Sequence, residues 1–219
     1  MLARALGVYE VSKMAAVRQF LKEGQTFIDV GGNKGDFSLL AARLTGKTGK
    51  VLCFEPEPSN CHWNRQSIKL NGYENISLHE IALSDHDGTA QLYLGQNSGW
   101  HTLLSGQPGR GAGVITVRTA TLDSILCALS VTRVNVIKID VEGAELSVLE
   151  GARQTLLANP DVVLLVDIHP YYGIQPERIC SVLTEMGFSI HSMEPPFDKP
   201  VDVHGNLQEL VAYRPRREM

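Results

Sequence analysis

Several signals that would assign this 219-residue chain to a familiar class are missing from its sequence. No segment approaches 18 uninterrupted apolar residues, so the sequence predicts no membrane span. The four cysteines form no C-x-x-C pair and have no histidine at zinc spacing, which argues against a structural zinc site. Cys53 and Cys127 stand in apolar runs, and we expect both to be reduced core residues of a cytoplasmic protein.

An excess of positive charge is also missing. The formal net charge is -4, and the basic cluster of Arg214, Arg216 and Arg217 lies at the C-terminal end. Proteins that bind nucleic acid normally carry a basic surface, so no nucleic-acid partner is expected. The N-terminal segment has Glu10 and Lys13 in a helical pattern and lacks the apolar stretch of a secretory signal, which again favours the cytoplasm.

What the chain has instead is a regular alternation of short apolar runs and amphipathic segments. This alternation predicts an α/β fold in which a doubly wound, mostly parallel sheet is covered by helices on both faces. We divide the chain into an N-terminal helical extension, 1–24, and a single domain, 25–219. Strands are expected at 27–31, 51–55, 76–81, 134–140, 162–168, 187–192 and 208–213, and helices at 9–22, 35–44, 57–71, 144–158 and 175–186.

Residues 88–126 interrupt the alternation and are expected to form an insertion. Two antiparallel strands, at 89–94 and 114–118, are predicted to flank a long Gly-rich polar loop. A loop of this length in a compact domain is usually functional or disordered, so a substrate lid and a disordered segment are both open. The loop covers 95–113 and contains Trp100 and His101.

The junction between the first expected strand and the next helix carries the strongest functional signal. It reads D-x-G-x-N-x-G from Asp29 to Gly35, and Gly31, Gly32 and Gly35 let the backbone turn tightly and approach a ligand. Such a turn before a helix N-terminus is how α/β proteins hold a nucleotide-like molecule. Glu55 ends the next strand, where a carboxylate can take both hydroxyls of a ribose.

The spacing of the junction discriminates between nucleotides. Counted from Gly31, a dinucleotide fingerprint would need glycines where Asn33 and Asp36 stand, and an acid at a helix start repels a pyrophosphate. A ligand with ribose and adenine but no phosphate fits better, and S-adenosylmethionine is the candidate cofactor. Asp29 and the turn backbone would hold its amino-acid end, because an ammonium needs acceptors. A tight turn without a ligand is the alternative for the glycines alone.

Polar residues also stand at the end of the expected strand 134–140. Period-two geometry puts Lys138 and Asp140 on one face, with Asp140 at the carboxyl tip as a partner for the lysine. Glu142 and Glu145 open the following helix, where negative charge complements the helix dipole, so a simple capping role is open for both.

Asp167 and His169 end the next strand in the same way. If the two strands are neighbours, these residues meet Lys138 and Asp140 in the crevice where doubly wound sheets bind ligands. His169 is then a candidate base, a neutral imidazole oriented by a carboxylate, although it could instead close its strand by a local hydrogen bond. Asp140, Asp167 and Glu142 could also bind a hard cation such as Mg²⁺ through oxygen.

Five segments form a longer pattern over roughly residues 26–170. In their order and spacing the chain resembles the FkbM family of S-adenosylmethionine-dependent methyltransferases, which have the class I fold. The most specific segment is Ile-Lys-Ile-Asp-Val-Glu-Gly-Ala-Glu at 137–145, whereas Gly32 departs from the Ala more usual in the glycine turn, a change expected to leave binding intact. The segments are 27–35, 49–56, 71–72 with 81–85, 121–123 and 137–145.

The resemblance implies a Rossmann-like, seven-stranded sheet with one antiparallel strand near the C-terminal edge. It also implies methyl transfer to an oxygen nucleophile, typically a hydroxyl on a sugar or a secondary metabolite. The implied contacts are Gly31, Asn33 and Gly35 with the methionine part, Glu55 with the ribose, Ala82 and Asp85 with the adenine, and Asp140 with the reacting methyl.

We therefore expect an S-adenosylmethionine-dependent O-methyltransferase that acts on a small-molecule or carbohydrate hydroxyl, with Asp140, His169 and Lys138 as its catalytic group. Two alternatives stay open. An NAD(P)-dependent oxidoreductase is disfavoured by Asn33 and Asp36. A non-catalytic S-adenosylmethionine-binding module is disfavoured by the acid/base corner, that is, the expected cluster of Lys138, Asp140, Asp167 and His169.

Overall fold

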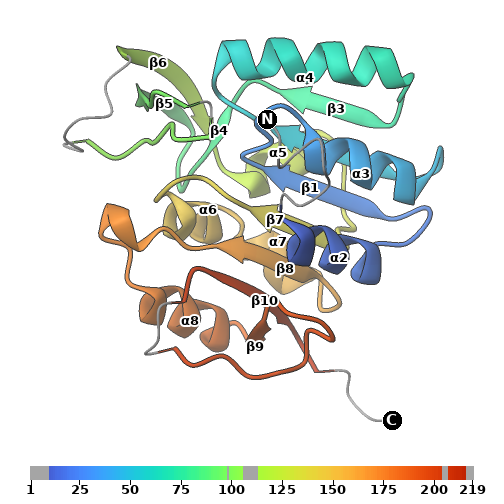
Figure 1. Cartoon of the computed structure of the whole chain (residues 1–219), viewed down its shortest axis with the longest axis vertical. Helices are drawn as coiled ribbons and strands as arrows, with labels where there is room; N and C mark the ends of the chain where they lie inside the picture. The colour runs from blue at the N-terminus through green and yellow to red at the C-terminus, as the bar shows by residue number, and fades with distance from the viewer. Residues whose placement is uncertain (1–9, 98, 106–112, 204–206, 216–219) are drawn as a thin grey trace.

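The computed structural model describes residues 10–97, 99–105, 113–203 and 207–215, and every structural statement below concerns these residues. A seven-stranded sheet crosses the molecule, with helices on both faces (Figure 1). Its strands are β1 (Thr26–Val30), β2 (Lys50–Phe54), β3 (Ile76–His79), β7 (Val136–Ile139), β8 (Val163–Asp167), β9 (Ser189–Ser192) and β10 (Glu209–Tyr213). The seven strands lie where the sequence predicts them, with ends shifted by one or two residues.

The order of these strands is β3-β2-β1-β7-β8-β10-β9. β1, β2, β3, β7 and β8 pair in parallel, whereas β10 runs antiparallel to both β8 and β9. The doubly wound, mostly parallel fold with one antiparallel strand near the C-terminal edge is therefore confirmed. The helices are α2 (Val11–Phe20), α3 (Asp36–Thr45), α4 (Pro58–Asn71), α5 (Leu122–Ala128), α6 (Glu145–Gly151), α7 (Arg153–Ala158) and α8 (Pro176–Glu185), with a 3-10 turn η1 (Pro170–Tyr172).

Successive residues of the central strands enter two different hydrophobic clusters. Ile28 and Val30 of β1 join the cluster formed with α5 to α8, whereas Phe27 joins the cluster formed with α2 and α3. Because both faces are covered, these strands read as continuous apolar runs rather than as alternating ones. The same period of two places Asp29 and Lys138 on the α2 and α3 side, beneath the glycine turn.

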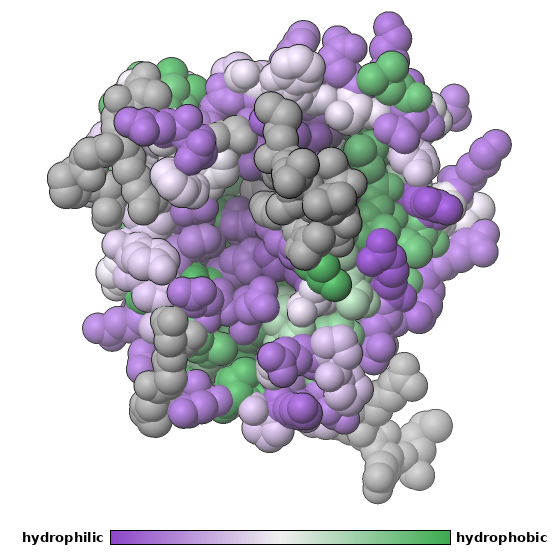
Figure 2. Space-filling view, viewed as in Figure 1, coloured by the Kyte–Doolittle hydropathy of each residue, from purple (hydrophilic) through white to green (hydrophobic). Residues whose placement is uncertain are grey.

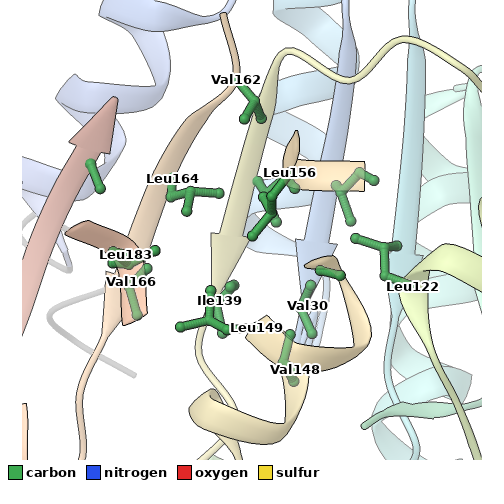
Figure 3. Close-up of a cluster of buried hydrophobic side chains, with 14 of the residues drawn as sticks. Val30, Leu122, Ile139, Val148, Leu149, Leu156, Val162, Leu164, Val166 and Leu183 are labelled. Atoms are coloured by element: carbon green, nitrogen blue, oxygen red, sulfur yellow. The ribbon is translucent and has the colours of Figure 1, made fainter. Parts of the chain in front are cut away.

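Figure 3 shows the first of these clusters, between the sheet and helices α5 to α8. Val30 and Ile139 come from adjacent strands, and Val148 and Leu149 come from α6. All four side chains are essentially buried. This packing fixes the ends of β1 and β7, where the polar residues of the site begin.

A second, three-stranded sheet follows β3 and contains β4 (Ala82–Leu83), β5 (Gly88–Leu94) and β6 (Gly113–Ala120). β5 and β6 are antiparallel, which confirms the predicted pair at 89–94 and 114–118, and β4 pairs in parallel with β6. The expected strand 76–81 therefore ends early, at His79, where the chain leaves the main sheet, and β4 begins at Ala82. In Figure 1 the small sheet lies at upper left, beyond the carboxyl ends of the central strands.

Three local predictions are corrected. The expected helix 144–158 is two helices that meet at Ala152, and α5 was not predicted although the Thr121 hydroxyl caps it by accepting the Ser124 N–H at 3.0 Å. Cys127 is exposed rather than buried, whereas Cys53 is a free, buried core cysteine as predicted. The expected helix 9–22 appears as α2, with residue 9 outside the described residues.

In the described ranges, no helix combines the length and apolar character that crossing a bilayer requires.

Candidate functional site

A cavity of about 720 Å³ opens at the carboxyl ends of the central strands and is bordered by the small sheet. Its volume falls in the range of pockets that hold cofactors and other small ligands. Figure 2 shows hydrophilic side chains around a hollow left of the centre of this face. The predicted site residues that line the cavity are Gly31, Asn33, Glu55, Ala82, Asp140, Glu142, Asp167 and His169.

Glu55 follows β2 and presents a buried carboxylate to the cavity. Its Oε2 accepts the Asn33 N–H at 2.8 Å, and its Oε1 accepts the Glu57 N–H at 2.9 Å. Burial raises the pKa of Glu55 to about 7, against the lowering effect of these two hydrogen bonds. Each carboxylate oxygen keeps acceptor capacity, so the group can still take two hydroxyls from a ligand.

Gly31 begins the turn after β1 and lies against the end of β7. Its φ is 76°, and a Cβ at this position would lie 1.8 Å from the carbonyl oxygen of Asp140. The Gly31 carbonyl accepts a hydrogen bond from Lys138 Nζ at 2.9 Å. The absence of a side chain therefore lets the turn and the strand tip meet at the cavity wall.

Gly32 and Gly35 do not line the cavity, and their role as ligand contacts stays a prediction. A Cβ on Gly35 would lie 2.7 Å from Oδ1 of Asn64, and a Cβ on Gly32 would lie 2.1 Å from Sγ of Cys53. Both glycines serve the packing of the turn against its own neighbours. The departure from alanine at Gly32 thus has a physical reason, namely the cysteine beneath it.

We expect Gly32→Ala to lower the free energy of unfolding by about 1–3 kcal/mol, because overpacking forces Sγ or the turn to move. The double variant Gly32→Ala with Cys53→Ala should cost less than the sum of the two single variants, because it removes the clashing sulfur. Urea unfolding of the four proteins measures this coupling. Additive costs would show that Cys53 does not explain the glycine.

Asp29 and Lys138 lie beneath the turn, and neither lines the cavity. Asp29 is fully buried, accepts the Ser38 hydroxyl at 2.6 Å and lies 3.4 Å from Lys138 Nζ, which lies equally far from Asp140 Oδ2. Burial alone would lower the pKa of Lys138, but Asp140 and Asp29 raise it above its usual value, so the lysine stays charged. Asp29 thus contacts Ser38 and Lys138 within the protein, and its contact with the ammonium of the cofactor stays a prediction. Lys138 supports the site from below.

The predicted adenine contacts separate in the structure. Ala82 lines the cavity, whereas Asp85 lies outside it, half-exposed, with Oδ1 2.7 Å from Nδ1 of His86. The contact of Asp85 with an adenine stays a prediction. Sequence reasoning also missed the apolar wall beside Ala82, because its members are core-like residues of several elements. They are Phe54, Ile81, Leu83 and Leu92.

The strands β7 and β8 are neighbours, as the predicted acid/base corner requires. His169 Nδ1 lies 2.7 Å from Oε1 of Glu145, and Nε2 lies 3.6 Å from Glu142 and 3.7 Å from Asp140. Burial would lower the pKa of His169, but the hydrogen bond to Glu145 and the nearby carboxylates raise it to about 9. In the protein alone these contacts favour the charged imidazole, and the role of His169 as a base stays a prediction. Glu145 is more than a helix cap, because its buried carboxylate orients His169.

Asp167 pairs with a residue that the sequence did not single out for the site. Lys13 of α2 donates to Asp167 Oδ2 in a buried ion pair, and Glu10 lies 3.4 Å from the same ammonium. Burial and the charge of Asp140 raise the pKa of Asp167. Of the predicted cation ligands Asp140, Asp167 and Glu142, Asp167 faces Lys13. His169 lies beside the other two acids in its place.

The insertion reaches the rim of the same cavity. Gly99, Trp100, His101 and Leu103 line it, and the Thr102 hydroxyl donates to the Glu142 carbonyl at 2.6 Å. The first part of the predicted loop 95–113 thus lies over the strand ends, while 106–112 are outside the described residues. A role as substrate lid stays a prediction.

Comparison with known proteins identifies a family. The Methyltransferase FkbM domain matches residues 29–190. The chain is 28% identical over 151 residues to 2-O-methyltransferase NoeI of Sinorhizobium fredii, covering 62% of this chain and 60% of that protein. It is 26% identical over 169 residues to hexuronic acid methyltransferase AglP of Haloferax volcanii, covering 77% and 65%. The matches thus span less than two thirds of these curated relatives.

A solved structure shares the fold. The crystal structure of Methyltransferase FkbM from Methylobacillus flagellatus superposes with a TM-score of 0.55 at 14% identity, covering 91% of this chain and 50% of that one. At this identity the likeness concerns the fold alone.

Proposed function

Because the chain belongs to the FkbM family of methyltransferases, we propose that it transfers a methyl group from S-adenosylmethionine to a hydroxyl oxygen of a sugar or another small molecule. One observation carries this proposal. A single cavity has the buried carboxylate of Glu55 on one wall and the Asp140 and His169 pair on another. When bound, the cofactor supplies a methyl carbon activated by a positive sulfur, so that an acceptor oxygen forms the C–O bond as the C–S bond breaks.

The residues at the donor end fit this cofactor. Glu55 offers two acceptor oxygens for the ribose hydroxyls, and Ala82 lies in an apolar wall suited to adenine. The backbone at Gly31 and Asn33 lines the space between Glu55 and Asp140, where the methionine part would lie. The net negative charge of the opposite wall favours a ligand with a positive sulfur.

The acceptor end fits a polar, ring-shaped molecule. Trp100 and Tyr171 line the cavity with 45% and 73% of their surface exposed, and aromatic faces offer apolar contact to the C–H face of a sugar ring. His169 and Asp140 would then approach the hydroxyl that is methylated. The names of NoeI and AglP support a sugar acceptor by analogy. The absence of a nucleic-acid partner stays a prediction.

Incubation of the protein with labelled S-adenosylmethionine and a panel of hydroxylated acceptors tests the proposed function. Transfer of label to an acceptor oxygen is expected, with uronic acids and free hexoses in the panel. Binding of S-adenosylhomocysteine without transfer to any acceptor would favour the non-catalytic module. Binding of a nicotinamide cofactor in its place would favour the oxidoreductase.

The pH dependence of donor binding should reflect the ionisation of the Glu55 carboxylate. We expect the affinity for S-adenosylhomocysteine to rise between pH 6 and pH 8, because the pKa of Glu55 is about 7 and the ionised carboxylate is the better acceptor for ribose hydroxyls. Glu55→Gln should lower the affinity by about ten- to a hundredfold, the value of hydrogen bonds to a charged group, and should remove the pH dependence.

Isothermal titration calorimetry at three pH values measures both effects. Glu185→Gln, an exposed acid on α8, is the matched control and should bind as the wild type does. Unchanged affinity in Glu55→Gln would remove the ribose assignment.

A further inference from the structure

The imidazole of His169 is held by one nitrogen and presents the other to the cavity. Nδ1 lies 2.7 Å from Oε1 of Glu145, a contact that fixes the orientation of the ring. Nε2 lies 3.6 Å from Oε1 of Glu142 and 3.7 Å from Oδ1 of Asp140. An N–H···O hydrogen bond spans about 2.7–3.2 Å, so Nε2 makes a normal hydrogen bond to neither acid.

The spacing of these three atoms is that of ligands around a shared ion. The ligand atoms of Asp140, Glu142 and His169 all lie within 4.8 Å of one another. Atoms at this separation can each lie about 2.1–2.4 Å from a cation placed between them, the usual length of bonds from divalent cations to oxygen or nitrogen. All three residues line the cavity, so the remaining coordination positions would open toward it.

Glu145 supplies an independent observation. Its side chain is fully buried, Oε1 accepts the Gly143 N–H at 3.0 Å in addition to facing His169, and Oε2 has no hydrogen-bond partner among the described residues. A buried carboxylate on the far nitrogen of a histidine is the usual support for a histidine that binds a metal, because it fixes the tautomer and makes the ring a better ligand.

The charges of the side chains around Asp140, Glu142 and His169 also favour a bound cation. Five carboxylates converge here, against three cationic groups, the ammonium groups of Lys13 and Lys138 and the imidazole of His169. Such an excess of buried negative charge is costly unless it is compensated. The carboxylates are those of Asp29, Asp140, Glu142, Glu145 and Asp167.

We propose that Asp140, Glu142 and His169 bind one divalent cation of the Mg²⁺ or Mn²⁺ type. Two oxygen donors and one imidazole suit these ions, which usually keep further positions for water or substrate. Its role rests on the proposed function: the acceptor hydroxyl binds at an open position, loses its proton to water more easily there, and the resulting oxygen takes the methyl group.

Electron paramagnetic resonance of Mn²⁺ tests the site without reference to turnover. The full chain is treated with a chelator, dialysed and titrated with Mn²⁺, and the signal of the free ion is followed. We expect one saturable site per chain. Glu142→Gln should weaken binding by at least tenfold, and Glu145→Gln, acting through His169, by about ten- to a hundredfold. Glu185→Gln should match the wild type.

Two results would overturn the proposal: no saturable Mn²⁺ binding by the wild type, or equal binding by the wild type and Glu142→Gln. Circular dichroism confirms that each variant is folded, and Glu142 is the first choice because it lies at the cavity rather than in the core. S-adenosylhomocysteine binding is measured on the same samples. Donor binding without Mn²⁺ binding refutes the cation alone, whereas Mn²⁺ binding without donor binding refutes the proposed cofactor alone.

Discussion

His169→Ala is expected to lower turnover by about 10²–10³-fold, the size of effect seen when a group that handles the reacting proton is removed. The affinity for S-adenosylhomocysteine should stay within about threefold of the wild type, because the proposed donor contacts, Glu55 and Asn33, lie on the other wall of the cavity. The reason is the position of Nε2, which faces Asp140 and Glu142 at the acceptor end. The expected loss is the same whether Nε2 acts on the hydroxyl directly or through a bound cation.

Steady-state kinetics together with calorimetry separate the two quantities. His86→Ala is the matched control, since His86 is exposed, pairs with Asp85 and lies outside the cavity. Glu145→Gln should reproduce part of the loss, because the imidazole would keep its place but lose its charged support. Wild-type turnover in His169→Ala would leave this histidine as a residue that only closes its strand.

The meeting of Glu55 with the glycine turn could be predicted because its signals are local in sequence. The apolar run of β1, the glycine turn and the acid at the end of β2 follow one another closely, and adjacent parallel strands bring them together. Glu55 and Asn33 accordingly meet at 2.8 Å, through a backbone N–H. The main sheet could be predicted for the same reason, because the spacing of apolar residues within each short segment indicates whether that segment is a strand or a helix.

The parts that escaped prediction depend on contacts between distant segments. Lys13 and Asp167 are 154 positions apart, and nothing in either neighbourhood identifies the partner. Asp85 lies outside the cavity, beyond the point where the chain leaves the main sheet after β3, and the sequence did not show this. The sequence did not show why residue 32 is glycine rather than alanine, because the side chain that leaves no room for a Cβ is that of Cys53 on the adjacent strand. The two-residue period of the strand also placed Lys138 on the same face as Asp140, but it did not show that the side chain points beneath the glycine turn.

The position of Lys138 leads to the largest stability effect we expect. Its side chain is 3% exposed, and its ammonium contacts three groups, namely the Gly31 carbonyl, Asp29 and Asp140. Removing one partner of a buried ion pair leaves a buried charge without compensation. Lys138→Met should therefore lower the free energy of unfolding by about 3–5 kcal/mol. For a chain of this size that corresponds to a melting temperature lower by roughly 6–20 °C.

A double variant decides whether the buried charge is the cause. Asp29→Asn in the Lys138→Met background should recover part of the lost stability, because it neutralises the carboxylate that the lysine compensated. Lys69→Met, at an exposed lysine of α4, should change stability by no more than about 0.5 kcal/mol. Thermal and urea unfolding of these proteins give the comparison. If Lys138→Met were as stable as the wild type but inactive, the lysine would act in the reaction itself, as the sequence first indicated, rather than by holding the turn and the strand tip together.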